Sequence, residues 1–109
     1  MKIDRVYLEQ ILDSVEKIKS FSRDFTYEQF VKDQKTQSAV IMQLALIGEV
    51  AKHVSTETKS QIDLPWKDIA GFRDRAIHDY YQIDLEIVWT TITNDLNILE
   101  ESLKTLLNK

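Results

Sequence analysis

Glycine and proline are scarce in this chain, whose 109 residues contain two glycines and one proline. Because these residues interrupt helices and supply most tight β-turns, their scarcity favours long, uninterrupted helices. No segment of useful length alternates apolar and polar residues as a half-buried strand would. We therefore expect an all-α fold, and the length is that of a single domain over residues 1–109.

Four segments carry apolar residues at helical spacing. Residues 4–20 form one apolar stripe opposite a charged face, and residues 36–55 are apolar around most of the helix, which predicts a central position. A third helix over 65–81 would hold Pro65 in its first turn, where proline is tolerated. Asp84 can cap a fourth helix that continues nearly to the C-terminus. The pattern predicts an antiparallel bundle of four long helices.

Two shorter segments connect these helices. Thr26 and Gln29 have the spacing of a capping box, which predicts a short fifth helix over 27–33, either fused to the next helix or separated from it by a kink. Residues 55–63 show no periodicity, so we expect them to form the longest loop.

Composition excludes several classes of protein. Without cysteine there is no disulfide, thiolate nucleophile or zinc finger. A net charge of −4 argues against broad coating of nucleic acid but leaves room for a small basic pocket for phosphate. The apolar run over 39–51 is too short to span a membrane, and Asp4, Arg5 and Glu9 stand where a signal peptide would be apolar. We expect a cytoplasmic protein.

The reactive side chains concentrate in "GFRDRAIHDYY", residues 71–81. The stretch holds two arginines, one of the two histidines, two aspartates and a pair of tyrosines. A histidine near a helix end is by itself more often structural than catalytic. The spacing of Arg73, His78 and Tyr80, however, resembles the Arg-x4-His-x-Tyr motif of the HepT-like branch of the HEPN superfamily. "IDLEIVW" downstream and "LALIGEVAKHVS" upstream extend the resemblance.

The resemblance implies a compact helical, metal-independent RNase that acts as a toxin and needs no cofactor. It also implies a minimal nucleotidyltransferase as antitoxin, which silences the toxin by attaching AMP to the motif tyrosine, here Tyr80. The added bulk and charge would block RNA. One departure is Asp74, where the family often has asparagine beside the motif arginine.

The residue types suit RNA cleavage. Histidine exchanges protons near neutral pH, so we assign proton transfer to His78. Arginine carries a permanent, forked charge that matches two phosphoryl oxygens, so Arg73 is expected to hold the phosphate, with Arg75 as an auxiliary contact. Asp74 precedes His78 by four residues and can orient its ring on the same helix face.

Helical geometry does not unite these side chains. At 100° per residue, Arg73 and Tyr80 lie about 20° apart around the helix, but His78 lies about 140° from Arg73. Either the helix ends or loosens near His78, or a second copy completes the site. HEPN relatives place two copies of the motif at a shared cleft, so we expect a homodimer.

Other candidates have ordinary structural explanations. His53 is expected near a helix C-terminus, where positive charge is favourable, and Glu49 is expected to make a buried structural contact. Trp66 and Trp89 are expected to anchor the core, and no spacing of ligands predicts a metal site. The alternative function is a non-catalytic helical adaptor that binds the nucleotidyltransferase, or a nucleotide, through the same face.

Overall fold

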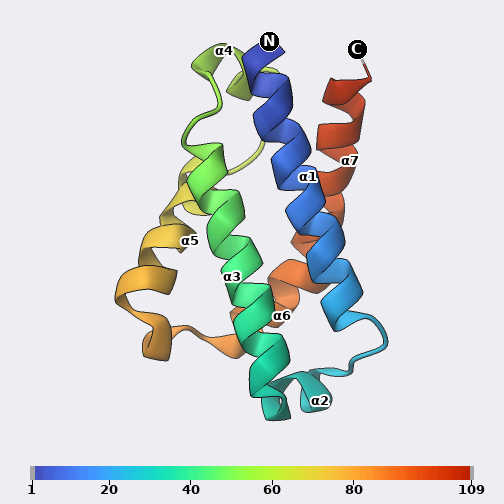
Figure 1. Cartoon of the computed structure of the whole chain (residues 1–109), viewed down its shortest axis with the longest axis vertical. Helices are drawn as coiled ribbons and strands as arrows, with labels where there is room; N and C mark the ends of the chain where they lie inside the picture. The colour runs from blue at the N-terminus through green and yellow to red at the C-terminus, as the bar shows by residue number, and fades with distance from the viewer. Residues whose placement is uncertain (1, 109) are drawn as a thin grey trace.

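The computed structural model describes residues 2–108, with side chains from residue 4 onward, and the regular structure in that range is entirely helical. The expected four long helices are present, namely α1 (Lys2–Ser22), α3 (Gln34–Ala51), α5 (Trp66–His78) and α7 (Leu96–Leu107). Successive long helices run in opposite directions, with α3 between α5 and α1 and with α7 beside α1 (Figure 1). The predicted antiparallel all-α bundle is confirmed.

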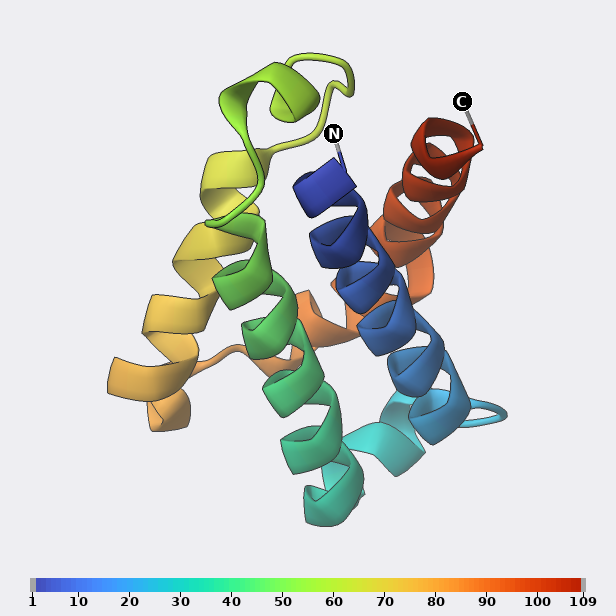
Figure 2. The same cartoon turned by 45° about the horizontal axis from the view of Figure 1, so that its top comes forward.

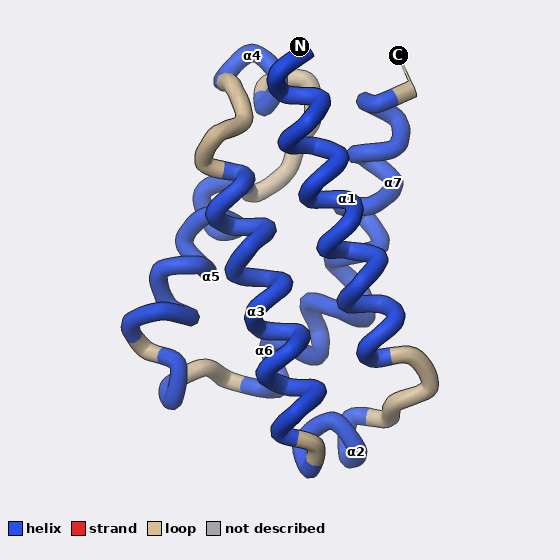
Figure 3. The backbone as a smooth tube through the Cα atoms, viewed as in Figure 1, coloured by secondary structure: helices blue, strands red, loops and turns tan. Residues whose placement is uncertain are grey.

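Shorter helical elements connect the long ones, as the mostly blue tube of Figure 3 shows. They are α2 (Tyr27–Lys32), α4 (Thr56–Lys59), the 3₁₀ turn η1 (Tyr80–Gln82), α6 (Leu85–Thr90) and the π-helical turn η2 (Thr91–Asp95). Figure 2 brings α4 forward at the end of the bundle where the N-terminus lies.

The short helix α2 begins with the predicted capping box. The Thr26 hydroxyl accepts from the Gln29 backbone N–H at 3.1 Å, and the Gln29 side chain accepts from the Thr26 N–H at 2.9 Å. Asp33 alone separates α2 from α3 and caps α3 by accepting from the Thr36 N–H at 3.0 Å. The two helices are therefore distinct, with a sharp change of direction between them.

Three details of the structure differ from the prediction. The expected loop over 55–63 contains the single turn α4, because the Ser55 hydroxyl caps it by accepting from the Thr58 N–H. The expected helix over 65–81 ends at His78. The fourth helix is capped by Asp84 as predicted but widens into η2, where threonine hydroxyls donate to backbone carbonyls one turn earlier, Thr91 to Ile87 and Thr93 to Trp89.

The core lies between α1, α3 and the α6–α7 segment. Its largest fully buried side chains are Leu8, Ile11, Val15, Ile18, Phe30, Val40, Val88, Leu96 and Leu103. They come from α1, α2, α3, α6 and α7, so burial of apolar surface, the main stabilising contribution, holds these helices together. Among the described residues, no helix is both long and apolar enough to cross a membrane.

A buried carboxylate joins the first turn of α1 to α4. Asp4 is 6% exposed and accepts hydrogen bonds from the hydroxyls of Ser55 and Thr58 and, at 3.1 Å, from the Ser55 backbone N–H. The Ser55 hydroxyl, followed by the Thr58 hydroxyl, lowers the pKa of the Asp4 carboxyl below its ordinary value. The ionised carboxylate therefore stabilises the contact between α1 and α4.

We expect Asp4→Asn to lower the free energy of unfolding by about 1 kcal/mol at pH 7, because a charged acceptor is replaced by a weaker neutral one. A depressed native pKa gives stability that is complete above the ordinary aspartate pKa and is lost as pH falls through the native value. Urea denaturation should therefore show the two proteins converging in acid. Asp13→Asn, which alters an exposed carboxylate of the same helix paired with Lys17, is the control. An equal loss in both variants would contradict the role of Asp4.

Candidate active site

Helix α5 ends inside the motif, and this early end shapes the site. Its last residue is His78, and Asp79, with φ −131° and ψ 37°, takes the chain out of the helix. The Asp79 N–H still donates to the Arg75 carbonyl at 2.8 Å, and Tyr80 then begins η1. The helix thus ends near His78, as the first alternative raised by the helical geometry expected, but this end alone does not bring the three motif side chains together. The motif is divided between the end of a helix and the turn after it.

Arg73 lies where α5 approaches α3 closely. Gly48 makes this approach possible, because a Cβ at its position would lie 2.6 Å from the carbonyl oxygen of Ile69 and 3.0 Å from the Cβ of Arg73. The two helices lie side by side in Figures 1 and 2. The missing side chain therefore places Arg73 against the last turns of α3.

The Arg73 guanidinium lies between two carboxylates. Its Nε is 3.7 Å from Oε1 of Glu49, and its NH1 nitrogen is 3.4 Å from Oδ1 of Asp74. Lys52 approaches the same two oxygens, with Nζ 3.2 Å from Asp74 Oδ1 and 4.0 Å from Glu49 Oε1. Glu49, Lys52, Arg73 and Asp74, which we call the four-charge cluster, carry two positive and two negative charges from two helices. Glu49 thus makes an interhelical contact, although it is only partly buried.

The cluster favours the ionised form of Asp74. A hydrogen bond from Lys52 and its positive charge, with smaller contributions from Arg73, lower the pKa of the Asp74 carboxyl below its ordinary value. The carboxylate is therefore ionised at neutral pH. Asp74 was expected to reach His78, but its contacts are with Lys52 and Arg73, and no hydrogen bond or ion pair joins it to His78 within residues 2–108. Its orienting role stays a prediction.

His78 and Tyr80 are exposed, but they are not joined to Arg73. His78 ends α5, and Tyr80 is 37% exposed with its hydroxyl 3.1 Å from the Ser38 hydroxyl of α3. No hydrogen bond or ion pair links any two of the three motif side chains in the described part of the chain. One chain therefore presents the three groups without assembling them around a single point.

Exposed apolar residues on α3 lie between Ser38, which contacts Tyr80, and Glu49, which contacts Arg73. Met42 and Leu46, which are 56% and 42% exposed, lie between Ser38 and Glu49 at helical spacing, so the four side chains share one side of α3. Ile77 of α5 is 57% exposed, one turn after Arg73. We call Met42, Leu46 and Ile77 the apolar patch. It lies beside the motif and is open to solvent in a single chain.

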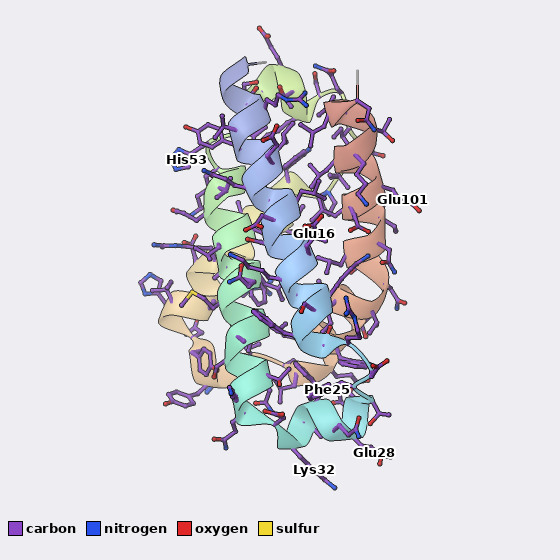
Figure 4. All side chains as sticks on the ribbon, turned by 45° about the vertical axis from the view of Figure 1, so that its right-hand side comes forward. Glu16, Phe25, Glu28, Lys32, His53 and Glu101 are labelled. Carbon is purple, nitrogen blue, oxygen red and sulfur yellow. The ribbon has the colours of Figure 1, made fainter. Side chains whose placement is uncertain are left out.

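The remaining candidates are exposed or structural. Arg75 lies at the surface with its guanidinium carbon 5.6 Å from the centre of the Phe72 ring, so it is open to a ligand. Tyr81 is 95% exposed and packs edge-on against Tyr80 with ring centres 5.5 Å apart. His53 lies at the end of α3 (Figure 4), where its ring is 5.6 Å from that of Tyr7.

Both tryptophans pack against the core, as expected. Trp89 lies 5.3 Å from the Phe30 ring, and the Trp66 indole donates to the Ile62 carbonyl at 3.4 Å. Among the described residues, no group of three or more histidine, aspartate or glutamate side chains is arranged to hold a metal ion.

Sequence reasoning missed Lys52 and Ser38. The only signal for Lys52 was its position three residues after Glu49, a spacing at which opposite charges meet on a helix. Its contact with Asp74 and the contact of Ser38 with Tyr80 both join α3 to the motif segment. Such contacts depend on how the helices pack, which a local pattern does not contain.

Comparison with known proteins gives consistent matches over most of the chain. The family model described as "Ribonuclease HepT-like" matches residues 11–106. A protein of Thermococcus cleftensis named "Probable ribonuclease HepT" is 38% identical over 95 residues, which are 86% of this chain and 86% of that protein. A "Putative RNase" of Caldanaerobacter subterraneus subsp. tengcongensis is 37% identical over 110 aligned residues, which cover 100% of this chain and 98% of that protein. Another "Putative RNase", from Methanocaldococcus jannaschii, is 38% identical over 105 residues, which cover 92% of this chain and 87% of that protein. No solved structure matches significantly.

Proposed function

The chain belongs to the HepT-like ribonuclease family, and on this premise we propose that it is a metal-independent RNA endonuclease that acts as the toxin of a type VII-like toxin–antitoxin pair in the cytoplasm. The supporting observation is the last turn of α5, where His78 is exposed five residues after Arg73 and two residues before Tyr80. The imidazole of His78, the guanidinium of Arg73 and the hydroxyl of Tyr80 thus all lie on one short segment.

The proposed reaction uses the 2′-hydroxyl of the RNA as nucleophile. As a base removes its proton, the 2′-oxygen forms a bond to the neighbouring phosphorus, and the bond to the 5′-oxygen breaks after that oxygen gains a proton. The products are a 2′,3′-cyclic phosphate and a 5′-hydroxyl. His78 carries the proton, and the permanent charge of Arg73 stabilises the negative charge that develops on the phosphoryl oxygens. Arg75, at the surface two residues away, can contact a neighbouring phosphate.

A homodimer explains why one chain leaves the motif divided. The apolar patch lies next to the motif, with Met42, Leu46 and Ile77 each more than two-fifths exposed. Burial of such side chains against their copies would contribute favourable free energy to association. A two-fold axis near the patch would bring the two motifs face to face, so that Arg73 of one chain and His78 of the other act on the same phosphate.

The direct test is cleavage of RNA by the purified chain with a chelator in excess. We expect cleavage to persist, with products that end in 2′,3′-cyclic phosphate. The competing function is a non-catalytic adaptor that binds a nucleotidyltransferase or a nucleotide through the same face, and the neutralisation of Arg73 by two carboxylates is the observation that favours it. An intact dimer that binds the nucleotidyltransferase but leaves RNA uncut would establish the adaptor instead.

Regulation is proposed to act through Tyr80. Its phenolic oxygen would lose its proton to solvent and form a bond to the α-phosphorus of ATP, held by the partner nucleotidyltransferase of the adjacent gene, as the bond from that phosphorus to the pyrophosphate leaving group breaks. The resulting tyrosyl-AMP places a bulky anion beside Arg73 and His78, where it would repel RNA. The Ser38 hydroxyl, 3.1 Å from the Tyr80 hydroxyl, holds the acceptor on the face of α3.

Tyr80→Phe is expected to abolish AMP transfer, because the phenylalanine ring has the same shape but lacks the acceptor oxygen. Intact-mass measurement after co-expression with the nucleotidyltransferase should show one or more added AMP units on the wild type and none on this variant. Tyr81→Phe, which removes the fully exposed neighbouring hydroxyl, is the matched control and should still be modified. Modification of Tyr80→Phe to the wild-type extent would exclude Tyr80 as the acceptor.

A further inference from the structure

The four-charge cluster contains two cations that converge on the same oxygen atoms. Lys52 Nζ and Arg73 NH1 lie 3.2 Å and 3.4 Å from Oδ1 of Asp74. The same two side chains lie 4.0 Å and 3.7 Å from Oε1 of Glu49. Asp74 Oδ1 therefore lies between the ammonium of Lys52, the residue that caps the end of α3, and the guanidinium of Arg73 in α5. A phosphoryl oxygen of RNA would require the same surroundings.

The Asp74 carboxylate is placed where a ligand can replace it. The Asp74 side chain is 55% exposed, whereas the Lys52 and Arg73 side chains are each 35% exposed. Ion pairs that are this open to water contribute little to stability, so their exchange for another anion costs little. Glu49 would keep its contacts with both cations during such an exchange, because Glu49 Oε1 approaches Lys52 and Arg73 from a position that Asp74 Oδ1 does not occupy.

The charge of Asp74 makes it a competitor for phosphate. With Asp74 ionised, the two cations and two carboxylates of the cluster sum to zero. When RNA displaces Asp74, Lys52 and Arg73 face the phosphate with only Glu49 as a counter-charge. Asp74 thus opposes RNA binding both by occupying the position and by repelling the phosphate.

We propose that Lys52 is a second phosphate-binding cation of the site, and that the Asp74 carboxylate occupies the position of an RNA phosphoryl oxygen until RNA displaces it. The proposal rests on the proposed function, in which Arg73 binds the phosphate. It adds a residue from α3 to a site otherwise formed by the motif segment, and it makes Asp74 an internal inhibitor of that site.

The test measures binding separately from cleavage. A fluorescent 2′-O-methyl RNA oligonucleotide, which has no free 2′-hydroxyl and cannot be cut, is titrated by anisotropy against the 109-residue chain at several salt concentrations. Lys52→Gln is expected to weaken binding about fivefold near 0.1 M salt and to reduce the slope of log affinity against log salt by about 0.7, the value for one lost phosphate contact on a single strand. Lys52→Arg should retain the wild-type slope. Asp74→Asn should bind about two- to fivefold more tightly, because it keeps the shape and removes the competing charge.

Lys17→Gln is the matched control, because Lys17 is also a surface lysine paired with an aspartate, Asp13 of α1. Equal affinities of Lys52→Gln and Lys17→Gln, an Asp74→Asn variant that binds no tighter than wild type, or a wild type that does not bind the oligonucleotide would each overturn the proposal. Cleavage of unmodified RNA by the same preparations is scored separately. If the chain cleaves RNA and Lys52→Gln cleaves it equally well, the proposed function stands and this inference fails. If the variants show the expected binding pattern but no preparation cleaves RNA, this inference stands and the proposed function fails.

Discussion

Replacement of His78 by alanine is expected to lower the rate of RNA cleavage by about 10²- to 10⁴-fold, because the variant lacks the imidazole that is proposed to carry the proton during the reaction. Arg73→Ala is expected to cost about 10²- to 10³-fold, because a preorganised charge next to the developing oxyanion is lost. Both effects are measured as the initial rate of cleavage of one RNA under chelator.

His53→Ala is the control for the first variant, because it removes the other histidine from the far end of α3, where it packs on Tyr7. It should cleave at the wild-type rate. The His78 side chain is exposed and is not part of the core, so thermal unfolding of His78→Ala should match the wild type. Cleavage by His78→Ala at the wild-type rate would remove histidine from the mechanism and leave the motif without a proton carrier.

The second large effect is expected at Gly48. An alanine Cβ there would lie 2.6 Å from the backbone carbonyl oxygen of Ile69, and a backbone atom cannot rotate away as a flexible side chain can. Helices α3 and α5 must separate, so we expect Gly48→Ala to lower the free energy of unfolding by about 1–3 kcal/mol, toward the upper end of this range. Cleavage should fall as well, since Arg73 shifts relative to Glu49 and Lys52.

Gly71→Ala provides a control of opposite sign. It lies inside α5, and a Cβ at that position meets nothing within 4 Å. The usual helix preference for alanine then applies, and we expect stabilisation by about 0.5–1 kcal/mol. Urea denaturation of both variants measures the difference. The same small stabilisation by Gly48→Ala and Gly71→Ala would contradict the close approach of α3 and α5 at Gly48.

The helices themselves could be predicted because the signals for them are local. The apolar spacing in residues 4–20 and 36–55, the capping box of Thr26 and the cap at Asp84 each operate within a few residues, and the structure contains all of them. The all-α bundle follows from these helices, because each has an apolar face that must be buried.

The details of the site could not be predicted in the same way. The end of α5 at His78 has no proline or glycine to mark it, and the continuing apolar and aromatic residues favoured a longer helix. The partners of Arg73 depend on Gly48, which lies 25 residues earlier in the sequence and acts only through the packing of α3 against α5. The motif therefore nominates candidate residues but does not predict the charges that surround them.

The most direct test of the shared site mixes two inactive variants. Arg73→Ala and His78→Ala chains are unfolded together, refolded as a mixture, and assayed for cleavage beside each variant refolded alone. If Arg73 of one chain acts with His78 of the other, a mixed dimer retains one intact site, and the mixture should recover a fraction of wild-type cleavage that rises with the share of mixed dimers. If both residues must come from the same chain, every dimer lacks a complete site. Mixed dimers that form but recover no cleavage would contradict the shared site.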